Sequence, residues 1–250
     1  MAEYESRENR AFAYEIKCLL STAEAQEVRA WARQRLDRDP NTVGGTGDTY
    51  RTTTLYYDTY GFDVFHRRGS FGRCKYRVRR YGSSESVFLE RKLRSHGIVT
   101  KRRTLVDIGE LDRLNEMEPD RNWEGHWFHA RMLARAMNPA CQIAYRRTAL
   151  VGQTDGGLIR LTLDEDLSAW RVSEPGYHPL SGGAPLVTDL AIVELKFRYA
   201  MPALFQEMLA EFRLSTQPVS KYHLAVTALG CAGQAPQPDP AAAGTAPVYA

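Results

Sequence analysis

The clearest structural signal in this chain lies in two neighbouring stretches, GRCKYRVRR at residues 72–80 and SVFLERKLR at residues 86–94. In the first stretch, cations alternate with Tyr76 and Val78. Side chains of a β-strand point alternately to opposite faces, so this spacing predicts a strand with one cationic face and one apolar face. The second stretch repeats the pattern, although Arg91 interrupts its apolar side.

The same alternation recurs along the rest of the chain. Charged residues an even number of positions apart share a predicted strand face in five places, at Glu15 and Lys17; at Lys75, Arg77 and Arg79; at Glu90, Lys92 and Arg94; at Arg160 and Asp164, with Thr162 between them; and at Glu194, Lys196 and Arg198. A solvated sheet face explains any single strand of this kind. The recurrence of cations at strand centres instead favours an anion-binding face, and a closed sheet would place all these faces either outward or inward.

The overall charge hides this concentration of cations. The chain has 250 residues, 43% of them hydrophobic, with 33 Lys and Arg, 30 Asp and Glu and a formal net charge of +3. Between His66 and Arg103, however, there are 13 basic residues and two acids. A cationic segment in an otherwise acidic chain indicates a polyanionic partner.

The order of expected elements predicts one α+β domain of mainly antiparallel strands. Strands are expected at 11–19, 52–58, 63–67, 72–80, 86–94, 101–107, 141–153, 157–166 and 188–198, and helices at 21–36, 110–117, 124–137, 202–212 and 220–229. Ser21 and Glu24 have the spacing of a capping box. Residues 1–9 are expected to be a flexible N-terminus, 10–230 the folded domain, and 231–250 a disordered Ala- and Pro-rich tail.

Several functional classes are excluded by what the sequence lacks. Its four cysteines are far apart and form no CxxC pair, so neither a zinc site nor a disulfide framework is indicated. No uncharged apolar run approaches the roughly 20 residues that span a bilayer, and the N-terminus has no signal-peptide pattern. P-loop, HExxH and GxSxG motifs are absent. We therefore expect a cytoplasmic protein without a transmembrane segment.

A set of motifs resembles the VTC domain, the polyphosphate polymerase domain of the vacuolar transporter chaperone complex and a branch of the triphosphate tunnel metalloenzyme (CYTH-like) superfamily. The motifs occur in the family's order over about residues 10–229, and they are YEIK at 14–17, LYYDT at 55–59, YRVRRYG at 76–82, LERK at 89–92, YRRTA at 145–149, RLTLD at 160–164, IVELK at 192–196 and PVSKY at 218–222. The resemblance implies an antiparallel β-barrel with helices packed around it and a tunnel for triphosphate or polyphosphate.

The resemblance also implies roles for individual residues. The implied phosphate ligands are Lys17, Arg77, Arg79, Lys92, Lys101, Tyr145, Arg147, Arg160, Ser220 and Lys221, with Lys101 and Arg160 at looser motif positions. The implied catalytic residues are Arg77, Arg79, Lys92, Arg147 and Glu194. Glu194 would also bind Mn²⁺ or Mg²⁺. Arg67, Arg68, Arg80, Arg91, Arg102 and Arg103 are expected to face away from the tunnel, and Asp58 either orients a tunnel arginine or caps a turn.

One motif departs from the cyclase and thiamine-triphosphatase branch, because Ala13 stands where that branch has its first strand glutamate. The larger VTC proteins add an inositol-phosphate-sensing domain and membrane helices. This sequence shows neither, so we expect no regulation through such a domain, and any membrane partner would be a separate protein.

Three functions follow from these expectations. The first is a polyphosphate polymerase that transfers the γ-phosphate of ATP to a growing polyphosphate chain. The second is a tripolyphosphatase or nucleoside triphosphatase that uses the same tunnel, and the third is a non-catalytic polyphosphate-binding module. Nucleic acid is not an expected partner, because cations inside a closed barrel cannot reach a duplex.

Overall fold

The computed structural model describes residues 13–40, 47–95 and 98–233. The predicted flexible residues 1–9 lie outside this part, and so do residues 234–250 of the predicted tail. The strands are β1 (Ala13–Ser21), β2 (Asp37–Arg38), β3 (Thr49–Thr59), β4 (Cys74–Tyr81), β5 (Ser86–Ser95), β6 (Ile98–Asp107), β7 (Met137–Thr154), β8 (Gly157–Arg171), β9 (Ala184–Pro185) and β10 (Leu190–Phe197). The helices are α1 (Thr22–Arg33), α2 (His126–Ala134), α3 (Ala203–Glu211) and α4 (Lys221–Leu229), with 3-10 turns η1 (Gly69–Arg73), η2 (Ile108–Asn115) and η3 (Cys231–Gly233).

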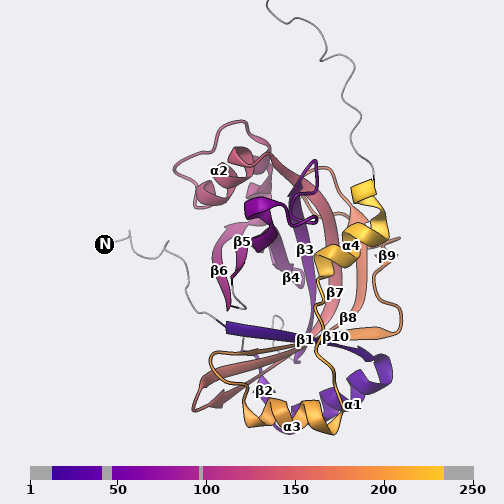
Figure 1. Ribbon diagram of the computed structural model, residues 1–250. Coiled ribbons are helices and arrows are strands. Elements are labelled where there is room, and N and C mark those ends of the chain that lie inside the picture. The colour runs from indigo at the N-terminus through magenta and orange to yellow at the C-terminus, as the bar shows by residue number, and fades with distance from the viewer. Residues whose placement is uncertain (1–12, 41–46, 96–97, 234–250) are drawn as a thin grey trace, which may run out of the picture.

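All strands belong to one antiparallel sheet with the order β2-β7-β3-β4-β5-β6-β1-β10-β8-β9. An additional pairing of β7 with β8 closes the central strands into a ring (Figure 1). The ring is weakest between β1 and β6, which pair only at Ala13 with Val99 and at Tyr14 with Ile98. The predicted α+β class is confirmed, with antiparallel strands in a ring-like sheet and helices packed against it.

Helices α1 and α3 cover the outer face of β1, β8 and β10 (Figure 1). Val28 and Trp31 of α1 and Phe205 of α3 lie in one buried apolar cluster with the outward side chains of these strands, such as Val193 and Leu195. The capping box predicted at the start of α1 is present, since Ser21 and Glu24 cap each other. The apolar faces of β1, β8 and β10 next to these helices therefore point out of the ring.

A second apolar cluster lies on the outer face of β3, β4 and β5. Phe128 and Met132 of α2 and Leu111 of η2 are buried in it with outward residues such as Val78 and Leu89. The helix expected at 110–117 forms instead as the 3-10 turn η2, which Asp107 and Glu110 cap.

Helix α4 packs on the inner side of the ring near one end, mainly against β7 and β8, and it also meets β3. The Tyr222 ring stacks on Tyr56, with centroids 5.2 Å apart, and the Tyr222 hydroxyl donates to Asp58. Cys231 in η3 is also buried, so the packed chain continues past α4. No helix in the described part of the chain has the length and apolarity needed to cross a membrane.

The prediction of a strand at 63–67 is wrong, because this segment is a turn. The Asp58 carboxylate accepts hydrogen bonds from the backbone N–H groups of Thr59, Val64 and Phe65, which folds the chain back on itself. Arg67 has a φ of 57°, a left-handed conformation that a continuous strand does not contain. Of the two roles left open for Asp58, the structure shows turn capping.

Candidate functional site

The charged faces of the strands point into the ring. Lys92 on β5 lies 2.5 Å from a carboxylate oxygen of Glu15 on β1, although β6 separates these two strands. Arg147 on β7 lies 3.8 Å from Glu194 on β10, with β8 between them. Side chains of non-neighbouring strands meet only on the concave side of a closed sheet. We call this inner surface the lumen face.

Strand pairing sets the lumen-face charges in rows. Directly paired residues of β4, β5 and β6 form two adjacent rows, Lys75, Lys92 and Lys101 in one and Arg77, Glu90 and Arg103 in the next. Like charges opposite one another in a sheet destabilise it. The row of three lysines therefore carries electrostatic strain that an anion in the lumen would relieve.

Glu90 is the carboxylate that balances the second row. It is fully buried and accepts a hydrogen bond from Arg77 Nε at 2.7 Å, while Lys101 and Arg103 each lie 3.5 Å from its other oxygen. Burial alone would raise the pKa of Glu90, but Lys101 and Arg77 hold it well below its usual range. The carboxylate stays ionised and fixes the position of Arg77.

A second network joins β1, β7, β8, β10 and α4. Arg147 donates from Nε and Nη2 to the two oxygens of Asp164, at 2.6 Å each. Lys221 Nζ lies 2.6 Å from Asp164 and 2.8 Å from Glu194, and Lys17 lies 3.0 Å from Glu194. Burial opposes ionisation of Glu194, but Lys17 and Lys221 hold its pKa well below the usual range.

Two lysines of the lumen face, Lys75 and Lys92, are poorly stabilised as cations. Burial, together with the charges of Lys17 and Lys92, lowers the pKa of Lys75 to about 7. Burial likewise lowers the pKa of Lys92 to about 8, although Glu15 acts in the opposite direction. Cations outnumber carboxylates on this surface, so these ammonium groups lack sufficient counter-charge.

Three buried hydroxyls add hydrogen-bonding groups to the lumen face. Among the residues that the structure describes, the Tyr145 hydroxyl and the Oγ1 atoms of Thr52 and Thr162 have no hydrogen-bond partner. Strand register places Thr52 opposite Tyr145 and Thr162 opposite Glu194. A buried polar group without a partner costs about 1–3 kcal/mol, so these groups point to a ligand that accepts hydrogen bonds.

Comparison with models of protein families shows which family the chain belongs to. The model of the family described as "VTC domain" matches residues 12–230. The chain belongs to the VTC domain family. This confirms the resemblance seen in the sequence motifs, and it makes the protein a polyphosphate-related tunnel protein.

Solved structures with a similar shape share little sequence with this VTC domain. A candidate adenylate cyclase from Bacillus halodurans is 14% identical with a TM-score of 0.49, over 83% of this chain and 92% of that one. A candidate adenylyl cyclase from Hippeastrum, described as having a dominant triphosphatase activity, is 16% identical with a TM-score of 0.48, over 88% of this chain and 95% of that one. No curated protein matches the chain.

The site residues implied by the VTC resemblance come together in the structure. The lumen face contains Lys17, Arg77, Arg79, Lys92, Lys101, Tyr145, Arg147, Arg160 and Glu194, and the start of α4 adds Ser220 and Lys221. Arg79 donates to Thr54 at 3.1 Å. Arg160 lies apart from the central networks, because Asp39 and the Tyr50 hydroxyl bind it at 2.7 and 3.2 Å.

The expectation that Arg103 faces away from the tunnel is wrong. Its side chain stacks over Phe88 and approaches Glu90, both on the lumen face. The sequence already indicates that Arg103 points inward, because Arg103 is two residues from Lys101 and residues two apart share a strand face. Arg102, one position earlier, does point outward and stacks over Trp127.

Other lumen-face groups were absent from the residues implied by the resemblance. They are Glu15, Lys75, Glu90, Asp164 and Lys196. All five belong to the alternating strand patterns, so the sequence contained the signal for their face. The sequence did not indicate which side chains these residues contact, because Lys75 contacts Ser220 and Asp164 contacts Lys221 across long sequence separations.

A divalent cation would need ligands from bound phosphates as well as from the protein to bind at this site. No cluster of three or more His, Cys, Asp or Glu side chains able to hold a metal occurs in the described parts of the chain. Mg²⁺ is commonly held by one or two carboxylates together with substrate phosphates and water. Glu194 is an ionised carboxylate on the lumen face, so it fits that kind of shared coordination.

Proposed function

We propose that this protein is a metal-dependent polyphosphate polymerase, which transfers the γ-phosphate of ATP to a polyphosphate chain held in the lumen. The observation that supports it most concerns the inner face of the closed ring. In the described part of the chain, cations outnumber carboxylates on that face and three of its buried hydroxyls lack hydrogen-bond partners. A linear polyanion complements both features. The VTC family match supports polyphosphate as that polyanion.

The arginines provide oriented phosphate contacts. Arg77 and Arg147 are each held by a buried carboxylate, Glu90 and Asp164 respectively, so their planar guanidinium groups are positioned before substrate arrives. A fixed guanidinium suits two-pronged recognition of phosphate oxygens. Lys17, Lys92 and Lys221 act as point charges that the phosphate chain can share.

The chemistry needs positioning and charge neutralisation more than a protein nucleophile. In the polymerase reaction the attacking group is the terminal phosphate of the growing chain, which is already anionic and requires no general base. Its oxygen forms a bond to the γ-phosphorus of ATP, the bond from that phosphorus to the β–γ bridging oxygen breaks, and ADP leaves. Lumen-face cations hold the two phosphates in line and neutralise their repulsion. Mn²⁺ or Mg²⁺, held by Glu194 with the phosphates, would supply further neutralisation of the transferred phosphoryl group.

A compartment and partner follow from the same proposal. The four cysteines are free and buried in the structure, which fits a reducing compartment such as the cytoplasm. ATP is the phosphoryl donor there. Passage of the product across a membrane would require a separate membrane protein.

A hydrolase is the second candidate, because water can reach part of the site. The side chains of Lys101 and Arg103 are 31% and 33% exposed, whereas that of Arg147 is 4% exposed. With water as the acceptor, the same lumen would release orthophosphate from tripolyphosphate or a nucleoside triphosphate.

One incubation separates these functions. Purified protein is mixed with ATP and Mn²⁺, and the products are resolved on a gel that distinguishes polyphosphate from orthophosphate. Long-chain product supports the polymerase. Orthophosphate without chain growth contradicts it and selects the hydrolase, whereas tight, salt-sensitive tripolyphosphate binding without turnover selects a binding module.

A further inference from the structure

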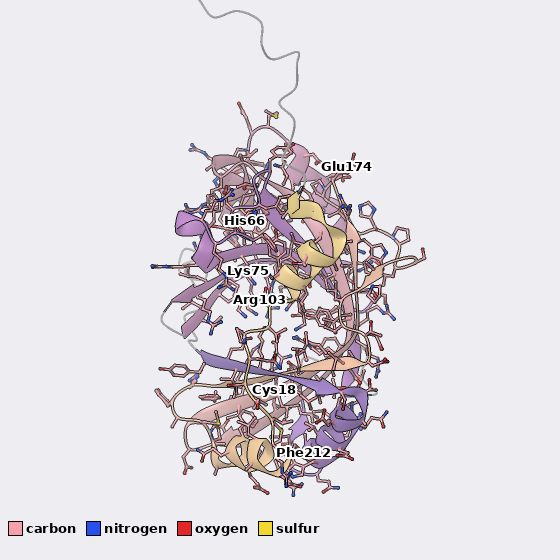
Figure 2. All side chains as sticks on the ribbon, turned by 45° about the vertical axis from the view of Figure 1, so that its right-hand side comes forward. Cys18, His66, Lys75, Arg103, Glu174 and Phe212 are labelled. Carbon is pink, nitrogen blue, oxygen red and sulfur yellow. The ribbon has the colours of Figure 1, made fainter. Side chains whose placement is uncertain are left out.

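One end of the lumen is bordered by side chains from the turn after β3, from β4 and from the start of α4. We call this group the mouth cluster, and it consists of Phe65, His66, Arg67, Lys75, Ser220 and His223. Lys75 Nζ lies 2.7 Å from Ser220 Oγ, which also accepts the backbone N–H of His223 at 3.2 Å. Figure 2 shows His66 and Lys75 beside α4. The cluster thus joins the lumen to the outside.

The outer part of the mouth cluster is a stack of flat rings. Phe65 and His223 lie parallel, with centroids 4.3 Å apart and an angle of 12° between the planes, and His66 meets Phe65 edge-on. His223 is exposed and Phe65 is half-buried. The backbone N–H of Phe65 is bonded to Asp58, so the ring pair rests on a fixed turn. Its solvent side is a preformed flat surface.

The charges around the stack suit a nucleotide. Burial, with the nearby charges of Arg67 and Lys75, lowers the pKa of His223, which favours its neutral imidazole. A neutral ring stacks on a nucleobase without placing another cation beside it. Lys75 and Ser220 lie directly inward and offer an ammonium group and a hydroxyl to phosphate oxygens.

We propose that the mouth cluster is a nucleobase platform, in which the base of a nucleoside triphosphate stacks on His223 while its phosphates enter the lumen past Lys75 and Ser220. Stacking accepts any base, because every base has a π-face. The platform therefore distinguishes a nucleoside triphosphate from bare tripolyphosphate, and it gives the proposed polymerase a way to hold its donor at one end. This inference rests on the proposed function in taking ATP as that donor.

The test compares two ligands that differ only in carrying a nucleoside. Calorimetric titrations with ATP and with tripolyphosphate are run on the wild type and on His223→Ala. Loss of one exposed stacking ring should weaken ATP binding by about fivefold to tenfold and leave tripolyphosphate binding unchanged. His223→Phe keeps a flat ring and should restore ATP binding.

Thr227→Ala serves as the matched control, because Thr227 is exposed one turn further along α4. It should change neither titration. The platform is overturned if His223→Ala alters the two ligands equally, or alters neither. Failure of the proposed polymerase looks different, since the wild type would then form no polyphosphate from ATP while the ATP-selective effect of His223→Ala persists.

Discussion

Glu194 lies among cations, although its expected role is to hold one more. Lys17 and Lys221 contact its carboxylate, and Arg147 lies 3.8 Å away. Such a group is ionised at every ordinary pH, but a divalent ion reaches it only when phosphates offset the surrounding positive charge. Metal binding and polyanion binding at this residue should therefore be coupled.

Glu194→Gln should abolish metal-dependent turnover while retaining tripolyphosphate binding. The amide keeps the shape of the side chain but removes the charge that would hold Mn²⁺ or Mg²⁺, and the lumen becomes more cationic. Turnover assays and calorimetry on the same preparation check this result. Arg77→Ala provides the contrast, because it should weaken both binding and turnover, and full activity in both variants would refute the site.

The lumen lysines predict that polyanion binding takes up protons. In the empty lumen the pKa of Lys75 is about 7 and that of Lys92 about 8, and bound phosphate raises both. Affinity for tripolyphosphate should therefore be greatest below the pKa of Lys75 and fall as the pH rises through these two values. Calorimetry in two buffers of different ionisation enthalpy measures the protons taken up.

Lys75→Gln should reduce that proton uptake without eliminating it, because Lys92 still titrates. Binding that releases protons, or affinity independent of pH between these two pKa values, would contradict the assignment of poorly stabilised lysines to the lumen. Proton uptake by Arg79→Lys provides a comparison, because this substitution adds a titratable lysine to the lumen-facing side of β4.

At the scale of elements, the turn after β3 and helix α4 depend on one carboxylate. Asp58 accepts from three backbone N–H groups of the turn and from the Tyr222 hydroxyl of α4. Burial raises its pKa in spite of these hydrogen bonds. The position of α4, and with it of Lys221 in the lumen, therefore depends on a residue outside the phosphate contacts.

Asp58→Ala should lower the free energy of unfolding by about 3 kcal/mol, because it leaves buried donors without an acceptor. Asp58→Asn retains one oxygen acceptor and should cost less. Denaturant unfolding monitored by circular dichroism measures both variants. Equal stability of Asp58→Ala and the wild type would show that the turn and α4 are held by packing alone.

At the scale of the whole molecule, the ring encloses more cations than carboxylates. Helices α1, α2 and α3 stabilise it from outside through apolar contacts, while the repulsion inside opposes folding (Figure 1). A ligand that binds the folded ring alone adds its binding energy to the stability. Without a ligand, repulsion between the lumen cations therefore lowers the free energy of unfolding below the value that the apolar packing alone would give.

Tripolyphosphate should raise the melting temperature far more than a simple salt does. At a concentration of 100 times its dissociation constant, a ligand adds about 2.7 kcal/mol to the free energy of unfolding. Thermal unfolding with tripolyphosphate is compared with unfolding in sodium chloride of equal ionic strength. An identical shift in both solutions would mean that general screening, not a lumen site, produces the effect.

Much of the fold could be predicted from local sequence patterns. Alternation marked β4 and β5 to within two residues at each end, and the Ser21 capping box marked the start of α1. The strand expected at 63–67 failed, because its structure depends on Asp58, a residue outside that segment. A local sequence pattern indicates only the conformation that a segment prefers by itself. Hydrogen bonds from its backbone to a carboxylate elsewhere, here that of Asp58, can override that preference.

The sequence by itself determined that five strands have one charged, mainly basic face and one apolar face, because side-chain alternation is a property of the strand backbone. Only the tertiary structure decided that the cationic faces point inward, since that depends on the pairing of β7 with β8 and on the helices that cover the outer face. Tertiary structure also decided which charges meet. Glu15 contacts Lys92, and Lys221 joins Asp164 to Glu194, because ring closure brings together side chains that lie far apart along the chain.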